Sequence, residues 1–290
     1  GAENVAVGSS ALLTEDGNGK NVAVGFEALK VQNAGADGYS TAIGYKALVA
    51  NTTGINNTAV GGLVMQANTT GTDNTAMGYA ALDANTTGTD NTAIGDFALS
   101  ENTTAAYNTA VGSSALLANT TGASNVAVGN AALDASTTGD DNVAIGSNSL
   151  GANTTASDNT AVGSSSLKLN TTGASNTAVG RTALSANTTA SNNTAVGFAA
   201  LLANTTGIYN TAVGSGSLAA NTTANHNAAV GYNALDANTT GTQNTAIGSQ
   251  ALGSNTTANN NTAVGMNALV ANTTGTQNVA VGSLAGDAIT

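Results

Sequence analysis

The chain has 290 residues, with five Lys and Arg against sixteen Asp and Glu, a formal net charge of −11, and neither Cys nor Pro. This acidic balance disfavours binding to phosphate backbones or acidic membrane surfaces, so we expect no nucleic-acid partner. The lack of Cys excludes a disulfide framework and thiolate chemistry, and no apolar run approaches the roughly 20 residues of a membrane-spanning helix.

A 17-residue repeat organises the chain. Its first residue is called the anchor, and positions counted from it are called columns 1 to 17. Only the step from Asn21 to Ser40 is 19 residues, which places a two-residue insertion near Gly35–Gly38. A period in this range predicts a solenoid whose copies stack as successive coils. The anchors are Asn4, Asn21, Ser40 and Asn57, followed by every seventeenth residue to Asn278.

The first predicted element of each coil is a short strand at columns 2 to 4, for example residues 58–60. Successive side chains of a strand point to opposite faces, so Thr58 and Val60 share one face and Ala59 occupies the other. Column 3 is Ala in every copy, column 4 is Val, Ile or Met, and column 5 is Gly. The Gly is expected to end the strand and let the backbone bend at a corner of the coil.

The segment Ala-Leu-x-Ala at columns 8 to 11 predicts a second short strand, in which Leu82 and Ala84 share a face. Column 9 is nearly always Leu, with Met65 and Gly286 as departures. The turn-forming run 85–88 then returns the chain to the next anchor. The fold class predicted is therefore all-β: a parallel β-solenoid, or β-roll, of about 17 coils with a 17-residue period and two short strands per coil. Stacking at roughly 4.8 Å per coil makes a rod of about 80 Å.

Asn residues in register are expected to form amide ladders, which supply hydrogen bonds in a thin core of Ala, Val and Leu. A structural role is therefore predicted for Asn57 and its equivalents. The whole chain, 1–290, is interpreted as one solenoid domain, with divergent N-terminal coils at 1–50 and regular coils at 51–290. Segments 14–17 and 31–34 replace Asn-Thr-Thr in the first two coils, which we interpret as a cap or a junction. Because the chain starts at Gly1 without Met and stops inside a coil, we expect a mature product or a segment of a longer protein.

The first strand is constant on both faces, whereas columns 6 and 17 vary between copies. Strands that are buried on both faces show this pattern, while half-exposed strands alternate with polar residues. Recent duplication could also preserve both faces, but the neighbouring columns should then not have diverged. We therefore predict that Ala faces the coil's own core and that column 4 packs on another chain. This chain–chain contact column comprises Val60, Ile94, Val111, Val128, Ile145, Val162, Val179 and Val196.

The phrase Asn-Thr/Val-Ala-Val/Ile-Gly-x-x-Ala resembles the head repeats of trimeric autotransporter adhesins, the YadA-like family. Examples are residues 21–25 followed by Ala28, and residues 142–146. Related repeats occur in phage tail fibres and other trimeric surface fibres. The resemblance covers all seventeen copies and implies a left-handed parallel β-roll, three of which pack about a common axis. The coil here is longer than is usual in that family, because the Asn-Thr-Thr-Gly segment extends the outer return.

Catalytic chemistry is not expected from this pattern. The single histidine, His226, falls in variable column 17 together with Tyr209 and Gln243, and is interpreted as a solvated corner residue. No strained elbow or Gly-rich nucleophile motif frames any Ser. Calcium-binding repeats would hold Asp in a fixed column, whereas Asp73 and Asp90 share column 17 with Ser, Asn, Gln and Tyr in other copies. No cofactor or metal is predicted.

The Thr pair at columns 13 and 14 supports an alternative function, because a flat Thr ladder on a rigid solenoid resembles the ice-binding faces of several antifreeze proteins. Thr also stacks well in β columns and bonds locally at corners. The predicted ice ladder comprises Thr69, Thr70, Thr86, Thr87, Thr103, Thr104, Thr120 and Thr121.

Two further patterns carry weaker hypotheses. Asn-Thr-Thr is an N-glycosylation sequon, repeated thirteen times, and is interpreted as a by-product of the turn. Aromatic residues share column 6 in five copies and are read either as sugar-binding platforms or as scattered corner packing. These residues are Phe26, Tyr45, Tyr79, Phe198 and Tyr232.

Together these features predict a non-enzymatic extracellular fibre or adhesive head that presents repeated surface columns for multivalent attachment. The expected partner is the chain itself, as a homotrimer or a head-to-tail polymer, together with a host-surface protein or glycan. The alternatives are a self-assembling filament subunit and an ice-binding rod. The expected location is extracellular or at the cell surface, with a virion tail fibre as the alternative.

Overall fold

The computed structural model describes residues 3–14 and 19–289. The chain divides into two compact units, Gly1–Asn142 and Val143–Thr290, each built from successive coils of the repeat. Every described strand has three residues, and no helix long and apolar enough to cross a membrane occurs in the described ranges. The segment 14–17, predicted to form part of a cap, falls mostly outside the described residues. The prediction of a single domain stays a prediction.

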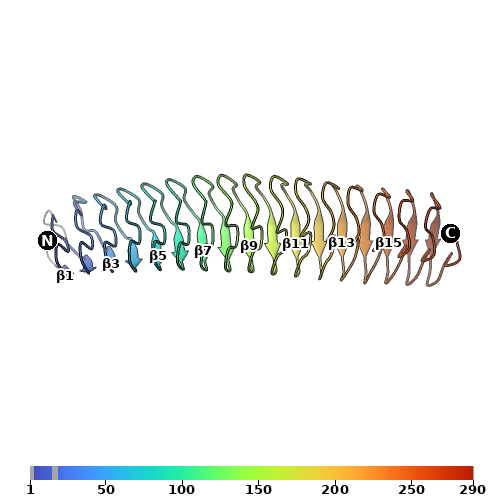
Figure 1. Ribbon diagram of the computed structural model, residues 1–290, viewed down its shortest axis with the longest axis horizontal. Helices are drawn as coiled ribbons and strands as arrows, with labels where there is room; N and C mark the ends of the chain where they lie inside the picture. Colours follow the sequence, from blue (N-terminus) through green and yellow to red (C-terminus); the bar gives the residue numbers. More distant parts are fainter. Residues whose placement is uncertain (1–2, 15–18, 290) are drawn as a thin grey trace. The chain divides into compact units, whose positions relative to one another are not determined.

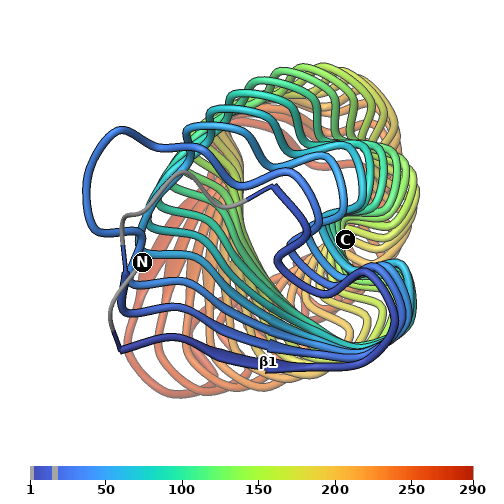
Figure 2. The same cartoon turned by 90° about the vertical axis from the view of Figure 1, so that its left-hand side faces the viewer.

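In the described part of the first unit, neighbouring strands pair in parallel and in register, each residue opposite its repeat equivalent. Figure 2 shows β1 along one side of the coil, with the strands of the following coils behind it. The strands of this unit are β1 (Val5–Val7), β2 (Val22–Val24), β3 (Thr41–Ile43), β4 (Thr58–Val60), β5 (Thr75–Met77), β6 (Thr92–Ile94), β7 (Thr109–Val111) and β8 (Val126–Val128).

The second unit repeats this arrangement, and its strands also pair in parallel in sequence order (Figure 1). The predicted parallel β-solenoid with a 17-residue period is confirmed. The strands of this unit are β9 (Val143–Ile145), β10 (Thr160–Val162), β11 (Thr177–Val179), β12 (Thr194–Val196), β13 (Thr211–Val213), β14 (Ala228–Val230), β15 (Thr245–Ile247), β16 (Thr262–Val264) and β17 (Val279–Val281).

The core of each coil is thin and is filled by small side chains. In a representative coil, Ala76, Ala81 and Leu82 have no exposed surface. Thr75 and Met77, on either side of Ala76 in β5, are exposed. The prediction that column 3 faces inward and columns 2 and 4 face outward is thus confirmed.

The prediction of a second strand at columns 8 to 11 is wrong, because the described residues of this segment form turns instead. Leu82 has a φ of +54°, in the left-handed region, and Ala80 just before the segment has a φ of +50°, so the chain cannot adopt a regular pleat here. It still bonds to the next coil, since the Leu82 N–H donates to Ala98 O at 3.0 Å. The left-handed conformation costs about 1–2 kcal/mol for a bulky residue. Burial of the Leu82 side chain offsets this cost, at about 1.5–3 kcal/mol for a fully buried Leu.

The column 5 glycine is required at its corner for two reasons. Gly78 has a φ of +134°, which L side chains rarely adopt. A Cβ on Gly78 would also lie 2.5 Å from the carbonyl oxygen of Gly95 in the next coil. This corner can therefore stack on the next coil at the strand spacing only when residue 78 is Gly.

The predicted amide ladders are confirmed, and two of them run inside the coils. In the first, at the anchors, Asn74 Nδ2 donates to Gly88 O at 2.8 Å, and Asn74 Oδ1 accepts from Asn91 N at 3.0 Å. In the second, at column 12, Asn85 Nδ2 donates to Asn68 Oδ1 at 2.8 Å and to Gly88 O at 3.0 Å. These buried bonds tie each coil to its neighbours and fix the return turn.

The two-residue insertion does not break the register. Ser40 occupies the anchor position after the insertion, where its N–H donates to Asn21 Oδ1 at 3.1 Å and its Oγ accepts from Asn57 N at 3.3 Å. Gln32 replaces Asn in column 12, and its side-chain oxygen accepts from Asn51 Nδ2. The divergent coils therefore keep the same internal bonding with different side chains.

Candidate functional site

The outward face of the strands, here called the strand face, consists of the side chains at columns 2 and 4. It carries Thr, Val or Ala at column 2 and Val, Ile or Met at column 4, and has no charged residue. Its column 4 side chains are substantially exposed, with Ile43 at 39%, Met77 at 48% and Ile94 at 38% in the first unit. Ile145 and Ile247 in the second unit are exposed to 39% and 42%.

The predicted contact column lies on the strand face in both units. Its valines are partly exposed and its isoleucines are exposed, so none is buried by the coil's own core. Because the strands are in register, these side chains form a continuous stripe along each unit. In the first unit the stripe includes Val60, Ile94, Val111 and Val128, and in the second it includes Ile145, Val162, Val179 and Val196.

The Thr pair does not present two equivalent columns. The hydroxyl of Thr86 at column 13 donates to Thr103 O of the next coil at 3.0 Å, and Thr69 donates likewise to Thr86 O at 3.0 Å. Thr87 and Thr70 at column 14 are exposed. The predicted ladder is thus divided into a bonded set and an exposed set. The bonded set is Thr69, Thr86, Thr103 and Thr120, and the exposed set is Thr70, Thr87, Thr104 and Thr121.

The sequon asparagines belong to the column 12 ladder inside the coil. Asn68 and Asn85 have no exposed surface. The side-chain nitrogen of each donates hydrogen bonds to the preceding Asn of the ladder and to a Gly carbonyl oxygen. A glycan linked to such a nitrogen cannot be accommodated in the folded coil. The interpretation of Asn-Thr-Thr as a feature of the turn is consistent with this burial.

Exposed aromatic side chains gather in the first unit, at the corner that follows the column 5 Gly. The Phe26 and Tyr45 rings stack with centroids 5.6 Å apart and an angle of 11° between their planes. The Tyr79 and Phe97 rings meet edge to face, with centroids 5.5 Å apart. Phe97 was not predicted from the column pattern, because it lies in column 7 and not in column 6. These four residues are called the aromatic row.

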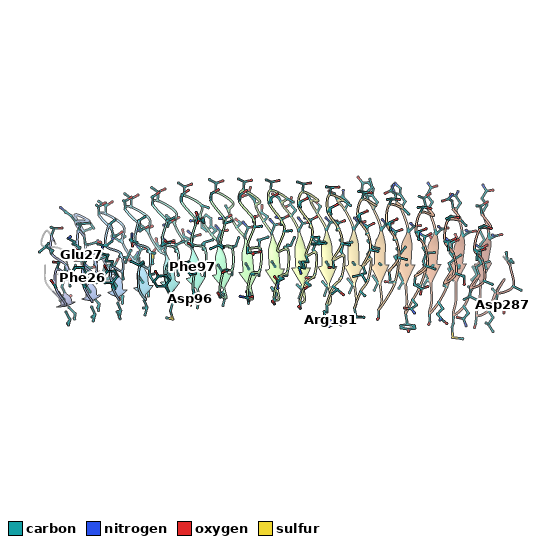
Figure 3. The ribbon with its side chains drawn as sticks, viewed as in Figure 1. Phe26, Glu27, Asp96, Phe97, Arg181 and Asp287 are labelled. Atoms are coloured by element: carbon teal, nitrogen blue, oxygen red, sulfur yellow. The ribbon has the colours of Figure 1, made fainter. Side chains whose placement is uncertain are left out.

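Charged groups flank the aromatic row, and Figure 3 shows Glu27 beside Phe26 and Asp96 beside Phe97. Glu27 pairs with Lys30 Nζ at 2.7 Å and with Lys46 Nζ at 3.8 Å. The hydrogen bond from Lys30 lowers the pKa of the Glu27 carboxyl below its ordinary value. Glu27 therefore stays ionised in mildly acidic solution.

A second charged cluster lies beside the insertion. Lys20 Nζ donates to Asp37 at 2.7 Å and to Tyr39 Oη at 2.9 Å. The hydrogen bond to Asp37 raises the pKa of Lys20, and the bond to Tyr39 makes a smaller contribution in the same direction. The Lys20 ammonium in turn lowers the pKa of Asp37. This cluster links Lys20 to the segment that contains the extra two residues.

Catalytic or metal-binding geometry does not emerge among the described residues. His226 is exposed and stacks on Tyr209 with ring centroids 5.2 Å apart. Within residues 3–14 and 19–289, no group of three or more His, Asp or Glu residues is arranged to hold a metal ion. No family model matches this chain, and no curated protein sequence matches it either.

Proposed function

We propose that this chain is a non-enzymatic extracellular structural or adhesive fibre segment that associates with copies of itself through the strand face. The observation that carries the proposal is the uncharged, partly exposed stripe of Val, Ile and Met on the strand face. Monomeric soluble proteins rarely expose contiguous apolar patches larger than a few hundred Å². Three such faces around a common axis would cover one another, which supports a homotrimer.

Register supports the same arrangement. Each coil presents one column 2 and one column 4 side chain at equivalent positions, so two strand faces can match along a whole unit with one geometry repeated at every coil. We also propose that the coils wind left-handed, as the resemblance to adhesin head repeats implies. The varied residues of columns 6 and 17 would then be presented to a host-surface protein or glycan.

The test compares Val111→Asp with Ser113→Asp, in the same coil. Val111 lies on the strand face, while Ser113 is exposed at the following corner. The wild type should have the mass of three chains in solution, Val111→Asp should shift it towards one chain, and Ser113→Asp should leave it unchanged. A monomeric wild type, or equal tolerance of both changes, would contradict the proposal. Long polymers would instead favour the head-to-tail filament.

A further inference from the structure

We propose that the aromatic row of Phe26, Tyr45, Tyr79 and Phe97 binds a neutral glycan chain. Four of the nine aromatic side chains in the whole sequence lie in this row, as two contacting pairs. All four are exposed, Phe26 to 45%, Tyr45 to 52%, Tyr79 to 50% and Phe97 to 43%. The core does not use them, since the buried interior is built mainly from Ala, Leu and Asn and contains no aromatic residue among those described.

The shape of the row fits a linear polymer. Its residues come from coils 2, 3, 5 and 6, so the rings follow one another along the stacking direction. Gly62 occupies column 6 of coil 4, between Tyr45 and Tyr79. A Cβ on Gly62 would meet only the Tyr79 ring, at 3.6 and 3.9 Å. The missing side chain leaves a notch flanked by two tyrosines, about 9–10 Å apart at the backbone because two coil spacings separate them.

The chemistry of the row favours a carbohydrate. An aromatic face is electron-rich, so it attracts the polarised C–H groups on the apolar face of a sugar ring. The hydroxyl groups at the sugar's edge need acceptors and donors, which Glu27 and Asp96 supply as carboxylates and Lys46 as an ammonium. Lys46 Nζ lies over the Tyr45 ring, 5.4 Å from its centroid, so an ammonium donor is next to this ring. Stacking surface and hydrogen-bonding groups thus lie side by side.

The local charge favours a neutral ligand. The two negative charges of Glu27 and Asp96 balance the two positive charges of Lys30 and Lys46. Glu27 already pairs with both lysines. Asp96 Oδ1 accepts from Tyr79 N at 3.1 Å, which holds this carboxylate beside the row. An acidic polysaccharide would meet no uncompensated positive charge there.

This inference deepens the proposed adhesive role by naming a ligand class, but the site lies within one chain and does not require assembly. In a trimer three rows would act together and increase the apparent affinity. In a monomer one row would bind the same ligand more weakly. Glycan binding and self-association can therefore fail independently of each other.

The test is electrophoresis of the full chain through native gels containing a soluble neutral polysaccharide: hydroxyethyl cellulose, laminarin, mannan or dextran. At least one should retard the wild type. Tyr45→Ala combined with Tyr79→Ala should weaken binding about tenfold or more, since two stacking contacts are lost. Phe198→Ala combined with Tyr232→Ala is the matched control, because both residues are exposed in column 6 outside the row. Tyr45→Leu should also weaken binding while keeping an apolar side chain.

Retardation by none of the four polysaccharides, retardation only by heparin, or equal weakening by the control pair would overturn the proposal. Circular dichroism of each variant checks that the solenoid remains folded. Solution mass is measured on the same samples, together with Val111→Asp. A monomeric chain that is still retarded would contradict self-association but support the aromatic row, and an unretarded trimer would do the reverse.

Discussion

Asn85 donates its side-chain Nδ2 hydrogen to Oδ1 of Asn68, 17 residues earlier, at 2.8 Å, and neither side chain has any exposed surface. The same Asn85 nitrogen also bonds to Gly88 O at 3.0 Å. One amide thus joins two coils and closes the return turn of its own coil. A buried polar group without a partner costs about 1–3 kcal/mol, so each amide of this ladder favours a hydrogen-bonding amide at the same column of the next coil.

Asn85→Ala is expected to destabilise the protein by about 2 kcal/mol, since it leaves Asn68 Oδ1 and Gly88 O without this donor and empties part of the core. The measurement is the urea concentration at half-unfolding. Asn56→Ala is the control, because Asn56 is exposed and its side-chain amide donates to the exposed Asp73 carboxylate at 3.0 Å. Equal losses in the two variants would contradict the ladder's role.

Ser136→Asn is expected to stabilise the protein by about 1 kcal/mol. Ser136 interrupts the column 12 ladder, and both its Oγ and Asn119 Oδ1 are buried without a hydrogen-bond partner. An Asn at this position could donate to Asn119 Oδ1, as its equivalents do in neighbouring coils. Thermal unfolding measures the gain, and Ser113→Asn at an exposed corner should show none. A lower melting temperature for Ser136→Asn would argue against this interpretation.

Gly78→Ala is expected to destabilise the protein by about 3 kcal/mol or more, because of its left-handed backbone and the close approach of Gly95 O. Gly62→Ala should be tolerated, since its added Cβ would make only ordinary contacts with Tyr79. Denaturant unfolding of both variants checks this contrast. Similar midpoints would show that the column 5 corner can relax.

Folded protein is expected to resist N-glycosylation at every described Asn-Thr-Thr site, because the acceptor nitrogens are buried. An oligosaccharyltransferase assay followed by mass spectrometry should detect glycan only after the chain is unfolded. Thr87→Val removes the sequon at Asn85 while changing an exposed side chain, so it provides the site-specific control. Modification of Asn85 in the folded state would contradict its placement in the ladder.

Stability is expected to depend on pH through Asp134 and Asp236. Burial raises the pKa of each carboxyl above its ordinary value of 3.8. A raised pKa means that the folded state favours the protonated form, so the contribution of these two carboxyls to stability is greatest below pH 3.8 and is lost as pH rises through their folded-state pKa. Asp134→Asn and Asp236→Asn should therefore raise the melting temperature at pH 7 and lose that advantage at pH 3. Exposed Asp90→Asn is the control, and an equal gain from it would refute a burial effect.

The aromatic row illustrates what sequence columns could and could not reveal. Column 6 identified Phe26, Tyr45 and Tyr79, because one column maps to one line on the surface. Phe97 belongs to column 7, and only the turn at this corner brings its ring against Tyr79. The Thr pair shows the reverse case: adjacent positions looked equivalent, yet one hydroxyl bonds to the next coil and the other side chain is exposed.

By itself the sequence determined the period, the parallel in-register stacking, the inward Ala of each strand and the Asn ladders. These features repeat in nearly every coil, so period and strand alternation are sufficient to derive them. The tertiary structure alone decided that columns 8 to 11 form turns, because burial of Leu82 offsets a left-handed backbone that local propensity disfavours. It also decided which hydroxyls and amides are accessible, since that depends on contacts between coils that no single repeat contains.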